Sequence, residues 1–269
     1  MCYEGAMAAD RSLEGQVALV TGGGKGIGRA IALDLAARGA RLLVTGRDER
    51  ALGETVGEIA HGGGQARHLA GDVRAEGHAA AAVARALETW GRLDVAVANA
   101  GVTGTTRMGQ AGALPRARAI VETNLLGAYY TFDAAAAAMK GAGRLVAISS
   151  VLGKVGAPGQ AAYCASKAGL HGLVRAIALE VGPRQITCNA VCPGWVDTEM
   201  ARGRIEELAA GAGKAYDVAR RDAAREVPIG RFVHVEEVAG LVAFLCSPAG
   251  AAITGQAVSI CGGSTAFGG

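Results

Sequence analysis

A tyrosine and a lysine, Tyr163 and Lys167, stand four residues apart in the segment YCASKAG. On a helix, side chains at this spacing lie on one face about 5–6 Å apart, so the phenol and the ammonium can meet. An ordinary tyrosine keeps its proton up to pH of about 10. A cation about 4 Å away, at an effective dielectric of about 20, favours the phenolate by about 4 kcal/mol, which lowers the pKa by roughly 3. The pair predicts an acid–base centre that works near neutral pH. An isolated pair of this kind is better explained as a surface tyrosine beside a solvated lysine, so other motifs must decide.

The elements that would position this pair are short apolar segments that alternate with segments of helical spacing. Runs rich in Val, Ile, Leu and Ala are typical of strands buried on both faces. A repeated strand–helix–strand order gives right-handed crossovers and a parallel sheet covered by helices on both sides. The sequence therefore predicts one doubly wound α/β domain over residues 13–269, after a disordered leader at 1–12. The expected strands are 16–20, 41–46, 66–73, 93–101, 144–150, 186–194 and 257–263.

Residues 198–231 interrupt this alternation between the sixth and seventh strands. The segment is charged, contains glycine, and follows the carboxyl end of a strand, where ligands of open parallel sheets bind. Long excursions in compact domains are often lids or binding loops. We expect a helical substrate lid here, and the alternative is a surface excursion without a role.

The composition excludes several classes of function. A net charge of +3 and an aromatic content of 4% do not favour nucleic acid as a partner. No apolar run reaches the roughly 18 residues of a membrane span, and the first residues lack the pattern of a signal peptide. We therefore expect a cytoplasmic protein that does not bind membranes. The six cysteines form no Cys-x-x-Cys pair, and the five histidines show no ligand spacing, so free thiols and no metal site are expected.

The first strand leads directly into a glycine-rich turn, TGGGKGIG, at residues 21–28. Missing side chains permit a tight turn and let backbone N–H groups approach a pyrophosphate at the start of a helix. The second strand ends in Gly46 and Arg47, where many NAD-binding proteins carry an acidic residue. Arg47 and Lys25 would attract a 2′-phosphate, although both could be ordinary surface cations. The sequence thus predicts NADP(H) as the cofactor.

Further motifs follow the ends of the later strands. Each of them alone would fit a helix cap or a turn. Together and in this order, they make the chain resemble the short-chain dehydrogenase/reductase family over nearly its whole length, which implies a Rossmann-type fold. One departure is Ala98, where members commonly carry an asparagine. The motifs are TGGGKGIG, Asp72-Val73, NAG at 99–101, Asn124 in VETNLLG, Ser150 in ISS, YCASK and CPGWVDT at 192–198.

The resemblance implies a catalytic tetrad. Tyr163 would be the general acid/base, and Lys167 would lower its pKa and hold the nicotinamide ribose. Ser150 would hydrogen-bond the substrate oxygen, and the backbone of Asn124 would hold a water in a proton relay to Lys167. The residues themselves agree with these roles, because negative charge grows on a carbonyl oxygen when hydride reaches its carbon.

The resemblance also completes the expected binding sites, since the segment from Pro193 to Thr198 is similar to the family's nicotinamide loop. The substrate pocket is expected to include Ser150, Leu152, Trp195 and Met200, and plain packing is as good an explanation for Trp195. The expected cofactor site consists of Thr21, Gly22, Gly24, Lys25, Gly26, Ile27, Gly28, Arg47, Asp72, Val73, Asn99, Ala100, Gly101, Tyr163, Lys167, Pro193, Gly194, Val196 and Thr198.

The segments VPIGRFVHVEEVAGLVAFLCS and SICGG resemble reductases of 3-oxoacyl thioesters and polyketide ketones. They are shared by alcohol, sugar and cyclic-ketone dehydrogenases of the family. We expect NADPH-dependent reduction of a ketone to a secondary alcohol, with a 3-oxoacyl thioester of an acyl carrier protein (ACP) or CoA as the first choice. The alternatives are an NAD(P)-dependent secondary-alcohol or cyclic-ketone dehydrogenase and a non-catalytic NADP(H)-sensing protein, which would tolerate loss of Tyr163, Lys167 or Ser150.

Partners are expected from charge and from apolar helices. Arg184 matches one of two cations that carrier-protein reductases use, but Lys140 only lies beside the other position, so ACP stays an open partner. Two helices, at residues 124–140 and after Tyr163, are apolar around much of their surface and predict a homotetramer. Arginines of the lid would suit a phosphopantetheine or CoA arm, or would be a solvated face paired with Glu206, Glu207 and Asp222. They are Arg202, Arg204, Arg220, Arg221 and Arg225.

Overall fold

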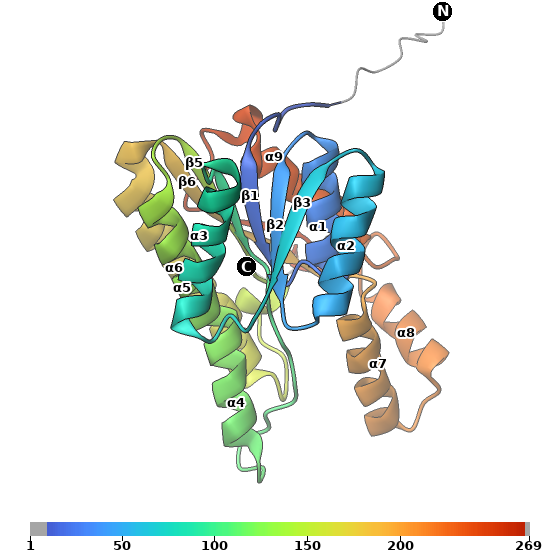
Figure 1. Cartoon of the computed structure of the whole chain (residues 1–269). Coiled ribbons are helices and arrows are strands. Elements are labelled where there is room, and N and C mark those ends of the chain that lie inside the picture. Colours follow the sequence, from blue (N-terminus) through green and yellow to red (C-terminus); the bar gives the residue numbers. More distant parts are fainter. Residues whose placement is uncertain (1–9, 267–269) are drawn as a thin grey trace, which may run out of the picture.

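A seven-stranded parallel sheet forms the centre of the computed structural model, which describes residues 10–266 (Figure 1). The strand order is β3-β2-β1-β4-β5-β6-β7, so the direction of winding reverses between β1 and β4. The predicted strands and the doubly wound topology are confirmed. The strands are β1 Val17–Thr21, β2 Arg41–Gly46, β3 Gln65–Ala70, β4 Val95–Ala98, β5 Gly143–Ile148, β6 Ile186–Pro193 and β7 Ala257–Ile260.

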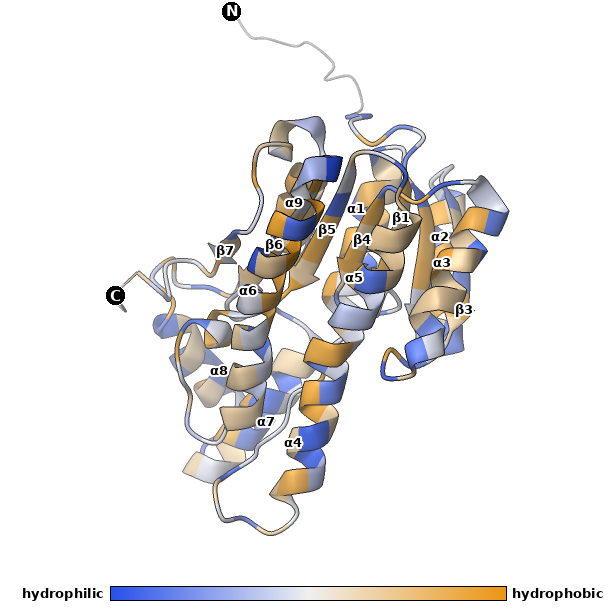
Figure 2. Ribbon diagram, turned by 90° about the vertical axis from the view of Figure 1, so that its left-hand side faces the viewer, coloured by the Kyte–Doolittle hydropathy of each residue, from blue (hydrophilic) through white to orange (hydrophobic). Residues whose placement is uncertain are grey.

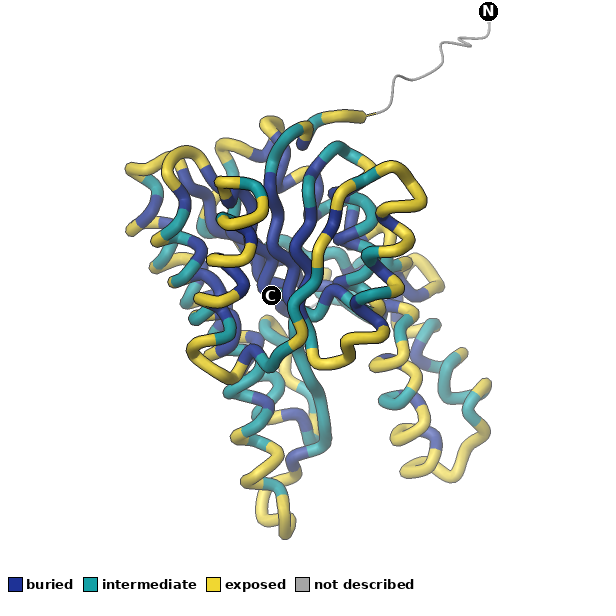
Figure 3. Tube along the Cα trace, viewed as in Figure 1, coloured by how far each residue is buried: buried dark blue, intermediate teal, exposed yellow. Residues whose placement is uncertain are grey.

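Alternate residues of each strand enter two different cores, as the pleat of a strand requires. Ala18 and Val20 of β1 pack with α1, α2 and α9, whereas Val17 and Leu19 pack with α3, α5 and α6. Both faces of the sheet are therefore covered, and Figure 3 shows the central strands buried between the helices, whereas the edge strands β3 and β7 are only partly buried. The helices of these layers are α1 Gly26–Ala37, α2 Glu49–His61, α3 Glu76–Trp90, α5 Gly127–Ala138, α6 Ala161–Val181 and α9 Val235–Cys246.

Three further helices extend beyond the carboxyl end of the sheet in both ribbon views (Figures 1 and 2). They are α4 (Ala113–Val121), α7 (Glu199–Ala212) and α8 (Tyr216–Arg225). The segment 198–231 is thus helical, as predicted. It leaves the domain at Val196 and returns at Val233, which pair in an isolated parallel bridge. This arrangement places the helical lid beside the edge of the sheet where the strands end.

The amino-terminal boundary of the domain is only partly visible. Most of the predicted leader, residues 1–9, lies outside the described residues, as do residues 267–269. Asp10 accepts a hydrogen bond from Arg38, and the Leu13 side chain is fully buried. Of the described residues, those from Asp10 onward are therefore already in contact with the domain.

Three features of the described residues concern membrane-spanning helices, metal-binding clusters and cysteines. No helix between residues 10 and 266 is long and apolar enough to cross a membrane. Within the same range, no three His, Cys, Asp or Glu side chains gather in a way that would hold a metal ion. The cysteines of this range are free thiols at positions 164, 188, 192, 246 and 261.

Candidate active site and dinucleotide cleft

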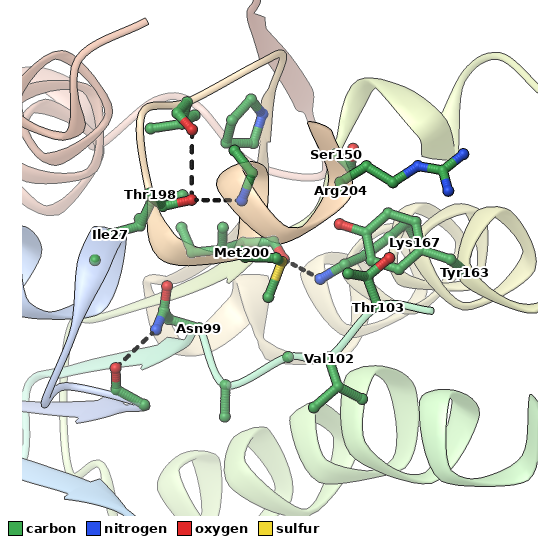
Figure 4. A pocket seen from close by; sticks show the side chains of 18 of the residues that line it. Ile27, Asn99, Val102, Thr103, Ser150, Tyr163, Lys167, Thr198, Met200 and Arg204 are labelled. Atoms are coloured by element: carbon green, nitrogen blue, oxygen red, sulfur yellow. Dashed lines mark hydrogen bonds between the residues drawn. The ribbon is translucent and has the colours of Figure 1, made fainter. Parts of the chain in front are cut away.

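A cleft of about 1350 Å³ runs along the carboxyl ends of the strands. It is lined by all the predicted cofactor, catalytic and pocket residues except Thr21 and Asn124. Figure 4 shows the labelled side chains from Ile27 and Asn99 on one side to Ser150, Tyr163 and Lys167 on the other. The tertiary structure therefore brings together segments that lie more than a hundred residues apart in the sequence.

The turn after β1 is shaped so that only glycine fits at two of its positions. Gly22 has φ +67°, a conformation that side chains rarely adopt, and a Cβ there would meet the Asn99 amide at 2.9 Å. A Cβ on Gly28 would lie 2.2 Å from the Gly22 carbonyl oxygen. Backbone thus packs directly on backbone where β1 enters α1.

The first turn of α1 leaves its N–H groups available to an anion. Its N-cap, Lys25, makes no side-chain cap hydrogen bond, and the first turn carries no acidic residue. Gly26, Ile27 and Gly28 of this turn line the cleft. Unpaired N–H groups and the positive end of the helix dipole favour a pyrophosphate, so the residues present fit the dinucleotide that the fold implies.

Thr21 supports the cleft from behind its wall. Its hydroxyl accepts hydrogen bonds from the main-chain N–H groups of Asn99 (3.0 Å) and Ala100 (3.1 Å). The Asn99 amide in turn donates to the carbonyl oxygens of Thr21 and Gly22, at 2.9 and 3.2 Å. These bonds lock the turn after β4 to the turn after β1, which makes Thr21 a supporting residue for the cofactor site.

The end of β2 combines the predicted cations with a carboxylate that sequence reasoning missed. Arg47 lines the cleft and is exposed, but Lys25 forms an ion pair with Asp48, with 3.0 Å between Nζ and Oδ2. Asp48 also caps α2 by accepting from the Ala51 N–H. The sequence offered one indication of this role, because Asp48 directly follows Arg47 at the N-cap of a helix. A 2′-phosphate bound here would meet Arg47 directly and Lys25 only in competition with Asp48.

The side chains predicted to be catalytic come from the end of β5 and the start of α6. Ser150 follows β5, and its Oγ accepts from the Leu152 N–H at 3.1 Å. Tyr163 and Lys167 lie one turn apart on α6, with Lys167 Nζ 5.7 Å from the centre of the Tyr163 ring. Lys167 is buried, and its Nζ donates to the Ile148 carbonyl oxygen at 2.8 Å. The three residues converge as predicted (Figure 4).

The electrostatics of this pair differ from the prediction. Burial raises the pKa of Tyr163 to about 12, and the neighbouring Ser150 hydroxyl offsets this only in part. Burial also lowers the pKa of Lys167 to about 8. The expected lowering of the tyrosine pKa by Lys167 is therefore wrong for the protein alone, because desolvation disfavours the charged form of both groups.

Asn124 lies in a short π-helical turn, Glu122–Leu126, between α4 and α5. Its buried side chain accepts from the Val102 N–H at 2.8 Å and donates to the Val102 carbonyl oxygen at 3.0 Å. It also donates to the Ser166 hydroxyl at 3.1 Å. A Cβ on Gly101 would lie 3.3 Å from Asn124 Oδ1 and 3.5 Å from Lys167 Nζ. Asn124 thus fixes the turn after β4 beside the lysine.

An aromatic pair stands where the lid leaves and rejoins the domain. Trp195 stacks on Phe232, with ring centres 5.5 Å apart, so it has a packing role. It also lines the cleft, and its role as a substrate-pocket wall stays a prediction. Of the five lid arginines, only Arg204 lines the cleft, where it donates to Thr105 (3.2 Å) and to Glu207 (2.8 Å).

The other lid arginines do not form the predicted cationic rim. Arg220 pairs with Asp197 at 3.2 Å, and Arg225 lies 3.8 Å from Asp222. Arg202 and Arg221 are exposed away from the cleft lining. The alternative of a solvated face fits these four better than a rim does, although of the expected partners only Asp222 is used, by Arg225.

Several cleft residues from other loops were not predicted, and three of them carry polar groups that nothing in the sequence marks. Arg107 and Thr103 follow β4, and Gln160 precedes α6. Arg184, expected to face a carrier protein, instead donates to the carbonyl oxygens of Ala136 (2.8 Å) and Met139 (2.5 Å) at the end of α5.

Comparisons with known proteins agree with this site. A family model described as enoyl-(acyl carrier protein) reductase matches residues 22–265. A Streptomyces coelicolor protein described as a ketoacyl reductase is 40% identical over 261 residues, covering 93% of this chain and 97% of the relative. The 3-oxoacyl-(acyl-carrier-protein) reductase FabG of Pseudomonas aeruginosa is 37% identical over 260 residues, with 94% and 98% covered.

Among solved structures, an actinorhodin polyketide ketoreductase variant with NADPH superimposes with a TM-score of 0.88. It is 39% identical, and the match covers 97% of this chain and 100% of the other. With the parallel sheet, the glycine turn and the Ser–Tyr–Lys arrangement, these matches define an oxidoreductase, and the chain belongs to the short-chain dehydrogenase/reductase family.

Proposed function

We propose that this enzyme uses NADPH to reduce the ketone of a 3-oxoacyl thioester to a secondary alcohol. The observation that carries the proposal is the convergence of Ser150, Tyr163 and Lys167 in the cleft that also contains the glycine turn and Arg47. An acid, a hydroxyl donor and a cation beside a dinucleotide site match the needs of carbonyl reduction.

The bound dinucleotide would supply the hydride that adds to the carbonyl carbon. Ser150 and Tyr163 would hydrogen-bond the carbonyl oxygen and stabilise the negative charge that grows on it. With a pKa of about 12, Tyr163 carries its proton at neutral pH. An alkoxide is a stronger base than a phenolate, so transfer of that proton to the product oxygen is favourable.

Lys167 would support this transfer with its charge. A pKa of about 8 keeps the buried ammonium largely protonated at neutral pH, next to the phenol. Its position would also let it hold the nicotinamide ribose. The backbone of Asn124 would hold a water that returns a proton to Lys167, which agrees with the closeness of both residues to Gly101.

The thioester is favoured by the relatives named above and by the two arginines at the cleft. Arg204 on α7 and Arg107 in the loop after β4 both line the cleft, although they lie far apart in the sequence. They could contact the phosphates of a CoA or phosphopantetheine arm, while Leu152, Trp195 and Met200 surround the acyl group. Arg184 caps the end of α5, so it does not support a carrier-protein surface, and the proposal is limited to a thioester.

A substrate panel tests this proposal. We expect a higher kcat/KM for acetoacetyl-CoA or acetoacetyl-ACP than for a small alicyclic ketone. If both thioesters are poorer, the enzyme is a secondary-alcohol or cyclic-ketone dehydrogenase. Crotonyl-CoA tests the alternative in the family model's description, reduction of a carbon–carbon double bond. If the protein binds NADPH but no carbonyl compound in the panel causes oxidation of the NADPH, the protein is a sensor and not a reductase.

We also propose that the enzyme is a homotetramer. Leu179 of α6 is 83% exposed and Tyr129 of α5 is 49% exposed, which suits a homotetramer that covers these helices. Light scattering after size-exclusion chromatography tests this, and a monomer would contradict it. We also propose a single domain over residues 13–269 and a cytoplasmic location.

A further inference from the structure

A buried polar cluster lies directly behind the catalytic residues and has no part in the chemistry above. It consists of Ser149 at the end of β5, His171 on α6 and Cys192 on β6, and these residues are only 3%, 6% and 0% exposed. His171 Nε2 lies 2.9 Å from Ser149 Oγ and 3.3 Å from Cys192 Sγ. Burying polar groups at this depth costs free energy of folding unless they are hydrogen-bonded. The mutual contacts of these three side chains offset that cost.

The hydrogen bonds determine which ring nitrogen carries the proton. Ser149 has one hydroxyl hydrogen, and it goes to the Lys167 carbonyl oxygen at 2.9 Å, because a carbonyl can only accept. The contact between Ser149 and His171 must then use a hydrogen on Nε2. Burial and the nearby cations Lys154 and Arg175 lower the pKa of His171, so the ring is neutral. Its tautomer is therefore the Nε2–H form.

This chain of bonds joins the main chain of Lys167 to Ser149, the residue directly before Ser150. Ser149 connects the end of β5, which carries Ser150, to the helical turn that carries Lys167. Cys192 on β6 approaches the same imidazole nitrogen, with 3.3 Å between Sγ and Nε2. His171 contacts both side chains and thereby fixes β5, β6 and α6 relative to one another.

The main chain at Gly153 packs closely against the His171 imidazole. A Cβ on Gly153 would lie 2.8 Å from His171 Cε1 and 2.9 Å from the Lys167 carbonyl carbon. The next residue, Lys154, donates to the Ala257 carbonyl oxygen (2.6 Å) and to Ser259 (2.8 Å) on β7. The turn after Ser150 is thus held against α6 on one side and against the edge strand on the other.

We propose that His171, as its Nε2–H tautomer, is a positioning residue that acts through Ser149 to set the place of Lys167 relative to Ser150. The proposal rests on the proposed ketone reduction for its kinetic consequence, but the tautomer does not depend on it. Displacement of catalytic groups by about 1 Å can cost about a hundredfold in rate. Loss of the imidazole N–H is therefore expected to lower kcat by roughly 10- to 100-fold.

Two variants at the same position separate positioning from packing. His171→Leu fills the space without a donor, whereas His171→Gln keeps an N–H near the place of Nε2. We expect the leucine variant to lose kcat with an unchanged KM for NADPH, and the glutamine variant to recover most of it. Equal kcat values for two variants that fold equally well would overturn the proposal, as would a leucine variant with the parent kcat.

Ser149→Ala provides the second test, and it also applies if His171→Leu does not fold. If His171 acts through Ser149, the alanine variant loses kcat as well, and the double variant is no worse than Ser149→Ala alone. Independent, multiplied losses would refute the connection. Cys188→Ala is the matched control, because this buried thiol of β6 has no hydrogen bond to the cluster.

The tautomer is tested without turnover. In protein with ¹⁵N-labelled histidine, the His171 ring is expected to give an Nε2–H signal that disappears in His171→Leu. An Nδ1–H tautomer, or a doubly protonated ring at neutral pH, would contradict the assignment. A correct tautomer in a protein that reduces no ketone would disprove the proposed function and leave the hydrogen-bond arrangement standing.

Discussion

Asp48 gives the sharpest test of how this cleft selects its cofactor. Its carboxylate neutralises Lys25 at the place where a 2′-phosphate would bind. Asp48→Asn removes the charge but keeps the oxygen that caps α2 through the Ala51 N–H. We predict that this variant binds NADPH more tightly and NADH with unchanged affinity, since only NADPH carries the additional phosphate.

The expected magnitude follows from the geometry of the ion pair. Lys25 Nζ is 3.0 Å from the carboxylate, so a phosphate that contacts Nζ at about 3 Å would lie about 5 Å from the same carboxylate. In a water-like site with a Debye length of about 8 Å, repulsion of two unit charges at this distance corresponds to about twofold in affinity, and about fourfold for a phosphate with nearly two charges. The effect should grow as the salt concentration falls.

Isothermal titration calorimetry with NADPH and NADH, at two salt concentrations, measures this change. Glu54→Gln is the control, because Glu54 is on the same helix but outside the cleft lining and pairs with Arg50. Arg47→Ala should weaken NADPH binding by roughly 10- to 150-fold, the value of a charge-assisted hydrogen bond. Weaker NADPH binding in Asp48→Asn, or equal gains for both cofactors, would refute the reasoning.

Three other predictions test the catalytic centre and the glycine turn. Tyr163→Phe should abolish turnover while calorimetry still shows NADPH binding, and activity within about tenfold of the parent enzyme would exclude the tyrosine as the acid. The kcat for reduction should fall as pH rises through about 8, because burial lowers the pKa of Lys167 to about 8 and the ammonium loses its charge above it. A rate that stays constant up to pH of about 9.5 would contradict that role. Gly28→Ala should lower Tm and prevent cofactor binding, since its Cβ would lie 2.2 Å from a carbonyl oxygen. Gly53→Ala in α2, with nothing within 4 Å, should leave cofactor binding unchanged and should not lower Tm, because alanine favours a helix over glycine.

The sequence by itself determined the fold and predicted where the candidate catalytic residues would lie. Continuous apolar runs identified strands buried on both faces, and parallel strands place their carboxyl ends, with Ser150 and Asn99, at one edge. The spacing between Tyr163 and Lys167 is a local property of a helix, so it could be read directly. Glycines at the β1–α1 turn were likewise visible, because their reason is local backbone conformation.

Only the tertiary structure decided the charges and the contacts between distant segments. The pKa values of Tyr163 and Lys167 depend on burial by the whole fold, and desolvation reversed the prediction made from the pair alone. Asp48 became relevant only when its ion pair with Lys25 was seen, and His171 only when β5, β6 and α6 met around it. Such interactions join residues far apart in the chain, and neither spacing nor residue type reveals which of them will touch.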